Sequence, residues 1–228
     1  MPLERKIAGD AHGWKNDADQ EETFGKEDEQ EMSRDGKNDA DLAWELVSCE
    51  NIVEDEWINF RKCEYRFPDG SIYGPFYTYS RRDYAVVVAT DTDGRYICVR
   101  QFRQGIGRVT TEFVAGGIER SGGRQYGTAP VEDTLEAAKR ELSEETGYES
   151  DEWRKLLVVP SNATIADNYA YIYEARNCVR KSGQSLDETE FLNVEKYTKE
   201  EIRSLIDEGE FPQAMHILAF HESLAGRP

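Results

Sequence analysis

Four charged residues suited to phosphate chemistry lie within six positions of one another: Arg140, Glu141, Glu144 and Glu145. Residues three and four apart share a face of an α-helix, so the three glutamates would project together. Two carboxylates ~5.5 Å apart repel by roughly 3 kcal/mol at an effective dielectric of ~20, and a bound divalent cation removes that cost. Mg²⁺ and Mn²⁺ prefer carboxylate oxygens and keep waters that substrate phosphates can replace. The alternative is an acidic face that meets only water.

The segment 132–147 carries its own signals for a helix. Asp133 is placed to cap the N-terminus, with Glu136 three residues on to complete a capping box. Gly147 is placed to end the helix, and Leu142 lies on a separate, apolar side. The sequence therefore predicts a helix that buries one side and presents carboxylates on another.

The order of these residues resembles the Nudix hydrolase box, G-x5-E-x7-R-E-U-x-E-E-x-G-U, where U is an apolar residue. The matching residues are Glu132, Arg140, Glu141, Leu142, Glu144, Glu145 and Gly147, with Tyr148 at the last U. The box glycine should lie six residues before Glu132, where Tyr126 stands instead. We therefore assign it to Gly116, followed by an insertion of about ten residues that is polar, rich in glycine and expected to form a loop.

Two upstream segments are similar to the ADP-ribose and ADP-sugar pyrophosphatase branch of that family. They are residues 99–103, which contain Gln-Phe-Arg, and residues 112–116, where Val114 replaces the proline of the branch. For each residue the alternative is an ordinary surface or strand-end side chain. The resemblance assigns metal binding to the Ala115 carbonyl, Glu141, Glu144 and Glu145, orientation of these carboxylates to Arg140, and substrate contact to Arg103 and Glu112.

The residue that activates water stays open between three candidates. In this branch a glutamate on a loop after the box often does so, and the matching loop is 161–168. Asn168 stands at the expected position, and Asp167 precedes it. Asp167 could accept a proton through a metal-bound water, whereas Asn168 could not. The other two candidates are Glu190 and a glutamate of the box itself.

The resemblance implies hydrolysis, dependent on Mg²⁺ or Mn²⁺, of a nucleoside diphosphate linked to a second moiety. ADP-ribose or another nucleotide sugar is the first expectation, and ADP-ribose would give AMP and ribose 5-phosphate. A GDP-sugar, a dinucleoside polyphosphate, NADH or a nucleoside triphosphate is the alternative within the same class. A Nudix-fold module that binds a nucleotide without cleaving it is the alternative from another class.

The net charge and the spacing of the cysteines limit the cellular compartment and the binding partners that we expect. A net charge of −18 argues against nonspecific binding to nucleic acid or to an anionic membrane, because both need a basic surface. Cys49, Cys63, Cys98 and Cys178 are scattered, without a C-x-x-C pair, and are expected to be reduced and structural. No apolar run has the length of a signal peptide core or a membrane span, so a cytoplasmic protein is expected.

Three parts are expected along the chain: a disordered acidic tail at 1–41, a β-rich segment at 42–80 and a Nudix domain at 81–228. Predicted strands cover 57–66, 72–79, 84–90, 96–102, 109–114, 153–159, 169–175 and 191–197, and further helices cover 198–208 and 213–224. His216 and His221 on the last helix are expected to be structural. The predicted fold is an α/β/α sandwich, a mixed sheet between helices, with an N-terminal antiparallel extension. In the relatives such an extension helps to form a homodimer.

Overall fold

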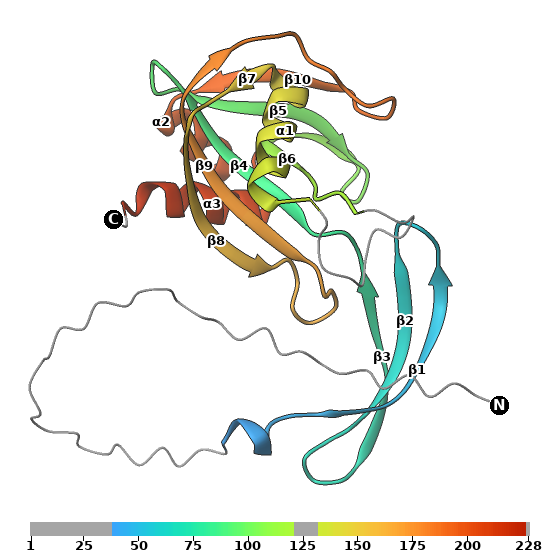
Figure 1. Cartoon of the computed structure of the whole chain (residues 1–228). Coiled ribbons are helices and arrows are strands. Elements are labelled where there is room, and N and C mark those ends of the chain that lie inside the picture. Colours follow the sequence, from blue (N-terminus) through green and yellow to red (C-terminus); the bar gives the residue numbers. More distant parts are fainter. Residues whose placement is uncertain (1–37, 121–131, 227–228) are drawn as a thin grey trace, which may run out of the picture. The chain divides into compact units, whose positions relative to one another are not determined.

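The computed structural model describes residues 38–120 and 132–226. The described elements belong to one compact unit, Asp39–Pro228. In chain order they are η1 (Asp39–Asp41), β1 (Glu45–Glu54), β2 (Asn59–Arg66), β3 (Ile72–Ser80), β4 (Tyr84–Asp91), β5 (Tyr96–Arg103), β6 (Arg108–Gly117), α1 (Thr134–Thr146), β7 (Tyr148–Glu149), β8 (Glu152–Pro160), β9 (Tyr169–Arg180), β10 (Leu192–Tyr197), α2 (Lys199–Asp207) and α3 (Ala214–Leu224), as labelled in Figure 1. The predictions for residues 1–37 and for the inserted loop at 121–131 lie outside the described residues.

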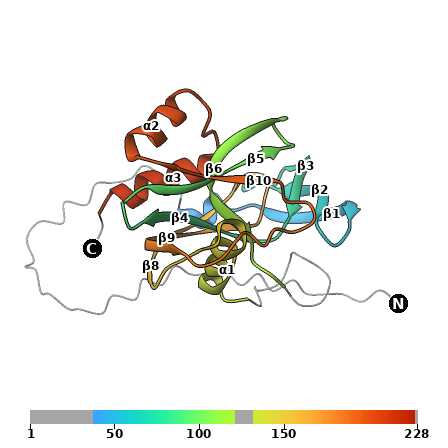
Figure 2. The same ribbon diagram turned by 90° about the horizontal axis from the view of Figure 1, so that it is seen from above.

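Seven strands form a mixed sheet in the order β10-β5-β6-β4-β9-β7, with β8 paired to β9. β4 and β9 run parallel, whereas β5, β6 and β10 pair antiparallel with their neighbours. β6 changes partner along its length, because its residues up to Phe113 pair with β5 and those from Val114 onward pair with β4. Figure 2 shows α1 on one side of this sheet and α2 and α3 on the other. The predicted α/β/α sandwich is confirmed.

The core consists of two apolar clusters, one on each face of the sheet. Side chains alternate between the faces of a strand, so Val87 packs in the cluster that holds Leu142 of α1. Its neighbour Val86 packs in the cluster that holds Phe113 and Phe220. β4 is consequently buried on both faces, which explains its continuous apolar run.

The two C-terminal helices begin and end where the sequence predicts. Thr198 and Glu201 form the reciprocal capping box at the start of α2, and Gly209 adopts a positive φ of 74° just beyond its end. Among the described helices, none is both long enough and apolar enough to cross a membrane.

The segment ahead of β4 forms a separate three-stranded antiparallel sheet in the order β1-β2-β3. The predicted hairpin at residues 67–71 is confirmed, with the Phe67 N–H donating to the Ser71 carbonyl and Gly70 at a φ of 86°. β1 was not predicted as a strand. Every side chain along it is exposed, so it lacks the alternation of buried and exposed residues that identifies a strand.

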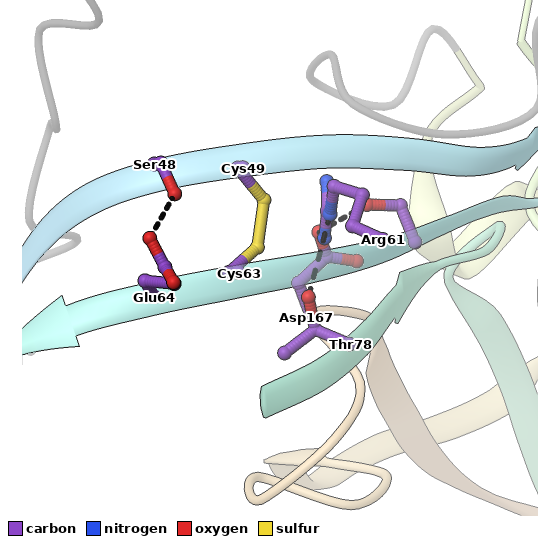
Figure 3. Close-up of a disulfide and its surroundings, with 8 residues drawn as sticks. Ser48, Cys49, Arg61, Cys63, Glu64, Thr78 and Asp167 are labelled. Carbon is purple, nitrogen blue, oxygen red and sulfur yellow. Dashed lines mark hydrogen bonds and ion pairs between the residues drawn. A yellow bond between two sulfur atoms is a disulfide. The ribbon is translucent and has the colours of Figure 1, made fainter. Parts of the chain in front are cut away.

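The described sheet of β1 to β3 is bonded to the loop at 161–168. β3 forms a parallel bridge from Tyr79 to Ala166, and the Tyr79 N–H donates to the Ile165 carbonyl at 2.8 Å. Arg61 of β2 forms an ion pair with Asp167 at 3.2 Å (Figure 3). The Ser80 hydroxyl also donates to Asp167. The carboxylate predicted as a candidate base therefore has two partners from the N-terminal sheet.

Cys49 and Cys63 form a disulfide between β1 and β2, drawn in Figure 3. The two residues are direct cross-strand partners, with their Cα atoms 4.1 Å apart. The expectation of four reduced thiols is wrong for this pair, because the pairing becomes visible only once β1 is recognised as a strand. Cys98 and Cys178 are free and buried, and burial raises the pKa of Cys178 to about 11.

Candidate active site

α1 forms because both of its ends are capped by its own sequence. The Asp133 carboxylate accepts the N–H groups of Leu135 and Glu136 at 2.9 and 3.1 Å. Gly147 adopts the left-handed conformation, with a φ of 73°, and its N–H returns to the Ser143 carbonyl. The predicted capping box is not closed, because the Glu136 carboxylate accepts a hydrogen bond from Lys139 at 2.8 Å.

Glu141 and Glu145 lie buried between α1 and the sheet, with only 7% and 3% of their surfaces exposed. Gly116 at the end of β6 faces Glu141 so closely that a Cβ atom there would lie 1.9 Å from the Glu141 Cδ. A side chain at this position would displace the Glu141 carboxylate, and this close approach supports the assignment of the box glycine to Gly116 across the insertion. Glu144 is more exposed, with 43% of its side chain accessible.

Arg140 links three carboxylates and the end of β6. Its Nε and Nη2 donate to the two oxygens of Glu132 at 2.9 and 3.1 Å, in the bidentate geometry that suits a guanidinium. Its Nη1 donates to Glu141 and Glu144, each at 2.9 Å, and its Nη2 also donates to the Gly117 carbonyl at 3.0 Å. The bond to Glu132, followed by the neighbouring negative charges, raises the pKa of Arg140. Arg140 therefore orients carboxylates, as the resemblance implies.

The buried carboxylates resist ionisation in the absence of a cation. Burial raises the pKa of Glu141 to about 7, although Arg140 opposes the shift. Burial, followed by the charges of Glu141, Glu190 and Glu112, raises the pKa of Glu145 well above its usual range. The Glu145 Oε2 is buried and accepts no hydrogen bond within the described part of the chain. A buried carboxylate oxygen without a donor is the atom that a metal ion would satisfy.

Arg103 and Glu112 come together on neighbouring strands beside the acidic pair. Glu112 of β6 is fully buried and forms an ion pair with Arg103 at the end of β5. The Gln213 amide donates to the other oxygen of Glu112. The positive charge of Arg103 partly offsets the raised pKa of Glu145, which places Arg103 in electrostatic reach of the carboxylate pair. The charges of both residues predicted to contact substrate thus act on the pKa of Glu145.

Of the two candidate bases outside α1, Asp167 and Glu190, it is Glu190 whose charge is among the causes of the raised pKa values of both carboxylates of the acidic pair. Asp167 is half exposed, pairs with Arg61 and acts on the pKa of Asp83 instead. The Asn168 amide is used to donate to the Arg82 carbonyl at 3.1 Å.

Comparisons with known proteins agree with this geometry. The family model described as NUDIX domain matches residues 80–217. The chain belongs to the Nudix family. It is 32% identical over 127 residues to the ADP-ribose pyrophosphatase of Bacillus subtilis (strain 168), and the aligned region covers 55% of this chain and 63% of that protein. It is 28% identical over 134 residues to the methanol dehydrogenase activator of Bacillus methanolicus, and the aligned region covers 58% of this chain and 67% of that protein.

A solved structure shares the fold. The crystal structure of an ADP compounds hydrolase superposes with a TM-score of 0.68 and 19% sequence identity, covering 81% of this chain and 94% of that one. Residues 80–217, which match the NUDIX family model, contain all of the acidic residues of the candidate site.

The residues present in this Nudix domain fit a divalent cation. Glu141 and Glu145 supply carboxylate oxygens, and the unpartnered Oε2 of Glu145 is suited to a cation. Within residues 38–120 and 132–226, however, no three His, Cys, Asp or Glu side chains already form a metal cluster. Mg²⁺ commonly binds through one or two carboxylates and retains several waters, so a two-carboxylate site remains compatible with it.

The contact between Gly116 and Glu141 gives a direct prediction. Replacing Gly116 by Ala is expected to displace the Glu141 carboxylate and lower kcat about tenfold or more, because a Cβ cannot lie 1.9 Å from its Cδ. Gly183→Ala is the matched control, since a Cβ at Gly183 meets nothing within 4 Å. Initial rates at saturating metal measure the effect. Equal rates for the two variants would contradict the role assigned to Gly116.

Two residues near the start of α3 were not predicted for the site: Gln213 at the N-cap position and His216 in the first turn. The Phe113 N–H donates to the His216 Nδ1 at 3.1 Å, next to Glu112. Burial, followed by the charge of Arg103, lowers the pKa of His216 to about 3, so the ring is neutral at physiological pH. His216 is structural as expected, but its partner is the strand that carries Glu112. No local sequence signal could show this, because it depends on where α3 packs.

Proposed function

We propose that this Nudix domain hydrolyses the diphosphate bond of a nucleoside diphosphate linked to a second moiety, with ADP-ribose as the first candidate. The observation that carries the proposal is the buried pair Glu141 and Glu145, with one carboxylate oxygen unpartnered, beside the Arg103 and Glu112 ion pair. Water would add across the diphosphate of ADP-ribose to give AMP and ribose 5-phosphate. The name of the Bacillus subtilis relative, ADP-ribose pyrophosphatase, supports the choice of substrate.

Each residue has a proposed role. Glu141 and Glu145, helped by Glu144 and the Ala115 carbonyl, would bind Mg²⁺ or Mn²⁺, which withdraws charge from the diphosphate and acidifies a bound water. Arg140 keeps the carboxylates on one side of α1 through its bonds to Glu132, Glu141 and Glu144. Arg103 would bind the substrate diphosphate, because a guanidinium matches its oxygens in bidentate fashion. Glu112 holds Arg103 in place through their ion pair.

We propose Glu190 as the residue that takes the proton from the attacking water. It is the candidate base whose charge acts on both carboxylates of the pair. Its Oε2 accepts the Asp187 N–H at 3.0 Å, which holds the side chain without neutralising it. Asp167 was the first choice from the sequence, but its carboxylate bonds Arg61 and Ser80.

One product analysis separates the possible substrates. The protein is incubated with Mg²⁺ or Mn²⁺ and with ADP-ribose, a GDP-sugar, a dinucleoside polyphosphate, NADH or a nucleoside triphosphate, and the products are separated by ion-exchange chromatography. We expect equimolar AMP and ribose 5-phosphate from ADP-ribose, at the highest kcat/KM of the set. Higher kcat/KM on another nucleotide would move the assignment to that substrate. Thermal stabilisation by ADP-ribose without any product would favour a nucleotide-binding regulator.

We also propose that the sheet of β1 to β3 contributes to a homodimer. β1 is exposed along its whole length, and Trp44, Leu46, Trp57 and Tyr73 are among the large hydrophobic residues exposed there. Exposed apolar surface of this kind is typical of an interface between chains. The mass of the protein in solution, measured by light scattering, tests this proposal.

A further inference from the structure

Gln213 occupies the N-cap position of α3 but does not cap the helix. Its side chain makes no hydrogen bond to the first turn. The Gln213 Nε2 instead donates to the Oε2 of Glu112, 101 residues earlier in the chain. Asn, Asp, Ser and Thr are the residues favoured at an N-cap, so the use of a longer side chain here is consistent with a more distant partner.

Glu112 depends on this partner because its charge is fully buried. A buried carboxylate is tolerated only where opposite charge and hydrogen bonds compensate for the loss of water. Arg103 pairs with Oε1 of Glu112, and Gln213 donates to Oε2. Oε1 has the charge of Arg103 close by but accepts no hydrogen bond among the described residues, whereas Oε2 accepts one from Gln213. The bond from Gln213 therefore fixes the rotation of the carboxylate that Arg103 meets.

Arg103 keeps an accessible surface for a ligand after it has paired with Glu112. Its side chain is 33% exposed, and its buried Nε has no hydrogen-bond partner among the described residues. The charge of Arg103 also acts on the pKa of Glu145, so the guanidinium is in electrostatic reach of the acidic pair. Its ion pair with the Glu112 carboxylate holds the guanidinium.

The start of α3 is itself fixed to β6. Residues of β6 up to Phe113 do not pair with β4, and the α2–α3 connection and α3 bond to this half of the strand. The Thr111 N–H donates to the Glu210 carbonyl at 2.9 Å, and the Phe113 N–H donates to His216 at 3.1 Å. Glu112 lies between these two bonds, so Gln213 approaches it from a helix that cannot shift without breaking them.

We propose that Gln213 is a positioning residue of the active site, which acts through Glu112 to direct the Arg103 guanidinium toward the substrate diphosphate. The inference rests on the hydrolase function proposed above. It extends the site to α3, on the opposite side of the sheet from the acidic helix (Figure 2).

Two variants separate positioning from helix capping. Gln213→Ser introduces a favoured N-cap residue that is too short to reach Glu112, and Gln213→Leu keeps the bulk without a donor. We expect both to lower kcat/KM for ADP-ribose about tenfold, mostly through a higher KM, because Arg103 would bind the diphosphate less well. The melting temperature of Gln213→Ser should stay at or above that of Gln213→Leu. Unchanged kcat/KM in a folded Gln213→Ser protein would overturn the proposal.

A double-mutant cycle tests whether the effect passes through Arg103. In an Arg103→Lys background, which keeps the charge but loses the planar fork, Gln213→Ser should change kcat/KM by less than about twofold. A full tenfold loss in that background would overturn the proposal.

A readout without substrate keeps the inference distinct from the proposed function. The side-chain Nε–H resonance of Arg103, assigned by its loss in Arg103→Lys, should shift in Gln213→Ser. An unshifted resonance would overturn the positioning role. If the wild-type protein cleaves none of the nucleotides, the hydrolase proposal fails, and this resonance still decides whether Gln213 orients Arg103.

Discussion

Replacing Glu145 by Gln is expected to lower kcat about 100-fold or more and, at the same time, to stabilise the metal-free protein at neutral pH. Glu145 is 3% exposed, and one of its oxygens has no hydrogen-bond partner in the described structure. Stabilisation of charge on a transferring phosphoryl group by a metal supplies several kcal/mol, so loss of a ligand is costly to the rate. Glu141→Gln should behave in the same way. A merely solvated acidic face would leave kcat unchanged.

The stability effect follows from the direction of the pKa shifts. Burial raises the pKa of Glu141 to about 7, above its value in the unfolded chain, and raises that of Glu145 as well. A carboxyl with a raised folded pKa contributes stability below its unfolded pKa and loses it as the pH rises through the folded value. The metal-free protein should therefore lose stability between about pH 4.5 and pH 7 through Glu141. The loss is roughly 2 to 3 kcal/mol and should be absent in Glu141→Gln.

Thermal unfolding with a chelator at pH 5 and pH 8, together with kcat at saturating Mg²⁺ or Mn²⁺, measures both effects. Glu136→Gln is the matched control, because Glu136 is an exposed residue of the same helix that pairs only with Lys139 among the described contacts. Added metal should stabilise the wild type and Glu136→Gln more than Glu141→Gln or Glu145→Gln. Full activity of Glu145→Gln at saturating metal would refute the metal site.

Glu190→Gln is expected to lower kcat about 100-fold, whereas Asp167→Asn should leave kcat within a few-fold of the wild type. General base catalysis contributes roughly 10²- to 10⁴-fold, and the charge of Glu190 acts on both carboxylates of the acidic pair. Asp167 instead forms an ion pair with Arg61 between side chains that are 51% and 25% exposed. Such a pair is worth about 0.2 to 1 kcal/mol, so Asp167→Asn should affect mainly the contact with the N-terminal sheet.

The sizes of the two rate losses assign the base. A fall in kcat of about 100-fold in Asp167→Asn with near-normal kcat in Glu190→Gln would assign proton transfer to Asp167. Binding of Mg²⁺ or Mn²⁺ by Glu190→Gln, followed by thermal shift, controls for damage to the metal site.

The sequence alone predicts those elements whose ends are set by neighbouring residues, such as capped helices and hairpin strands. α1 is specified by Asp133 at one end and Gly147 at the other, and both act within their own helical turn. β4 and β5 are specified by apolar runs on either side of a turn that ends in Gly94. The shared face of Glu141, Glu144 and Glu145 follows from helical spacing, whereas the role of Arg140 follows from the resemblance to the Nudix box.

The tertiary structure decided what depends on contacts between distant segments. β1 is exposed along its length, so its pairing with β2 and the disulfide of Cys49 with Cys63 left no periodic signal. The proposal of Glu190 over Asp167 as the base rests on such a contact, because Arg61, 106 residues away, bonds Asp167. The bond of Gln213 to Glu112 likewise requires α3 to pack against the half of β6 that does not pair with β4. Side-chain partners of this kind are fixed by the packing of whole elements, which local sequence patterns do not encode.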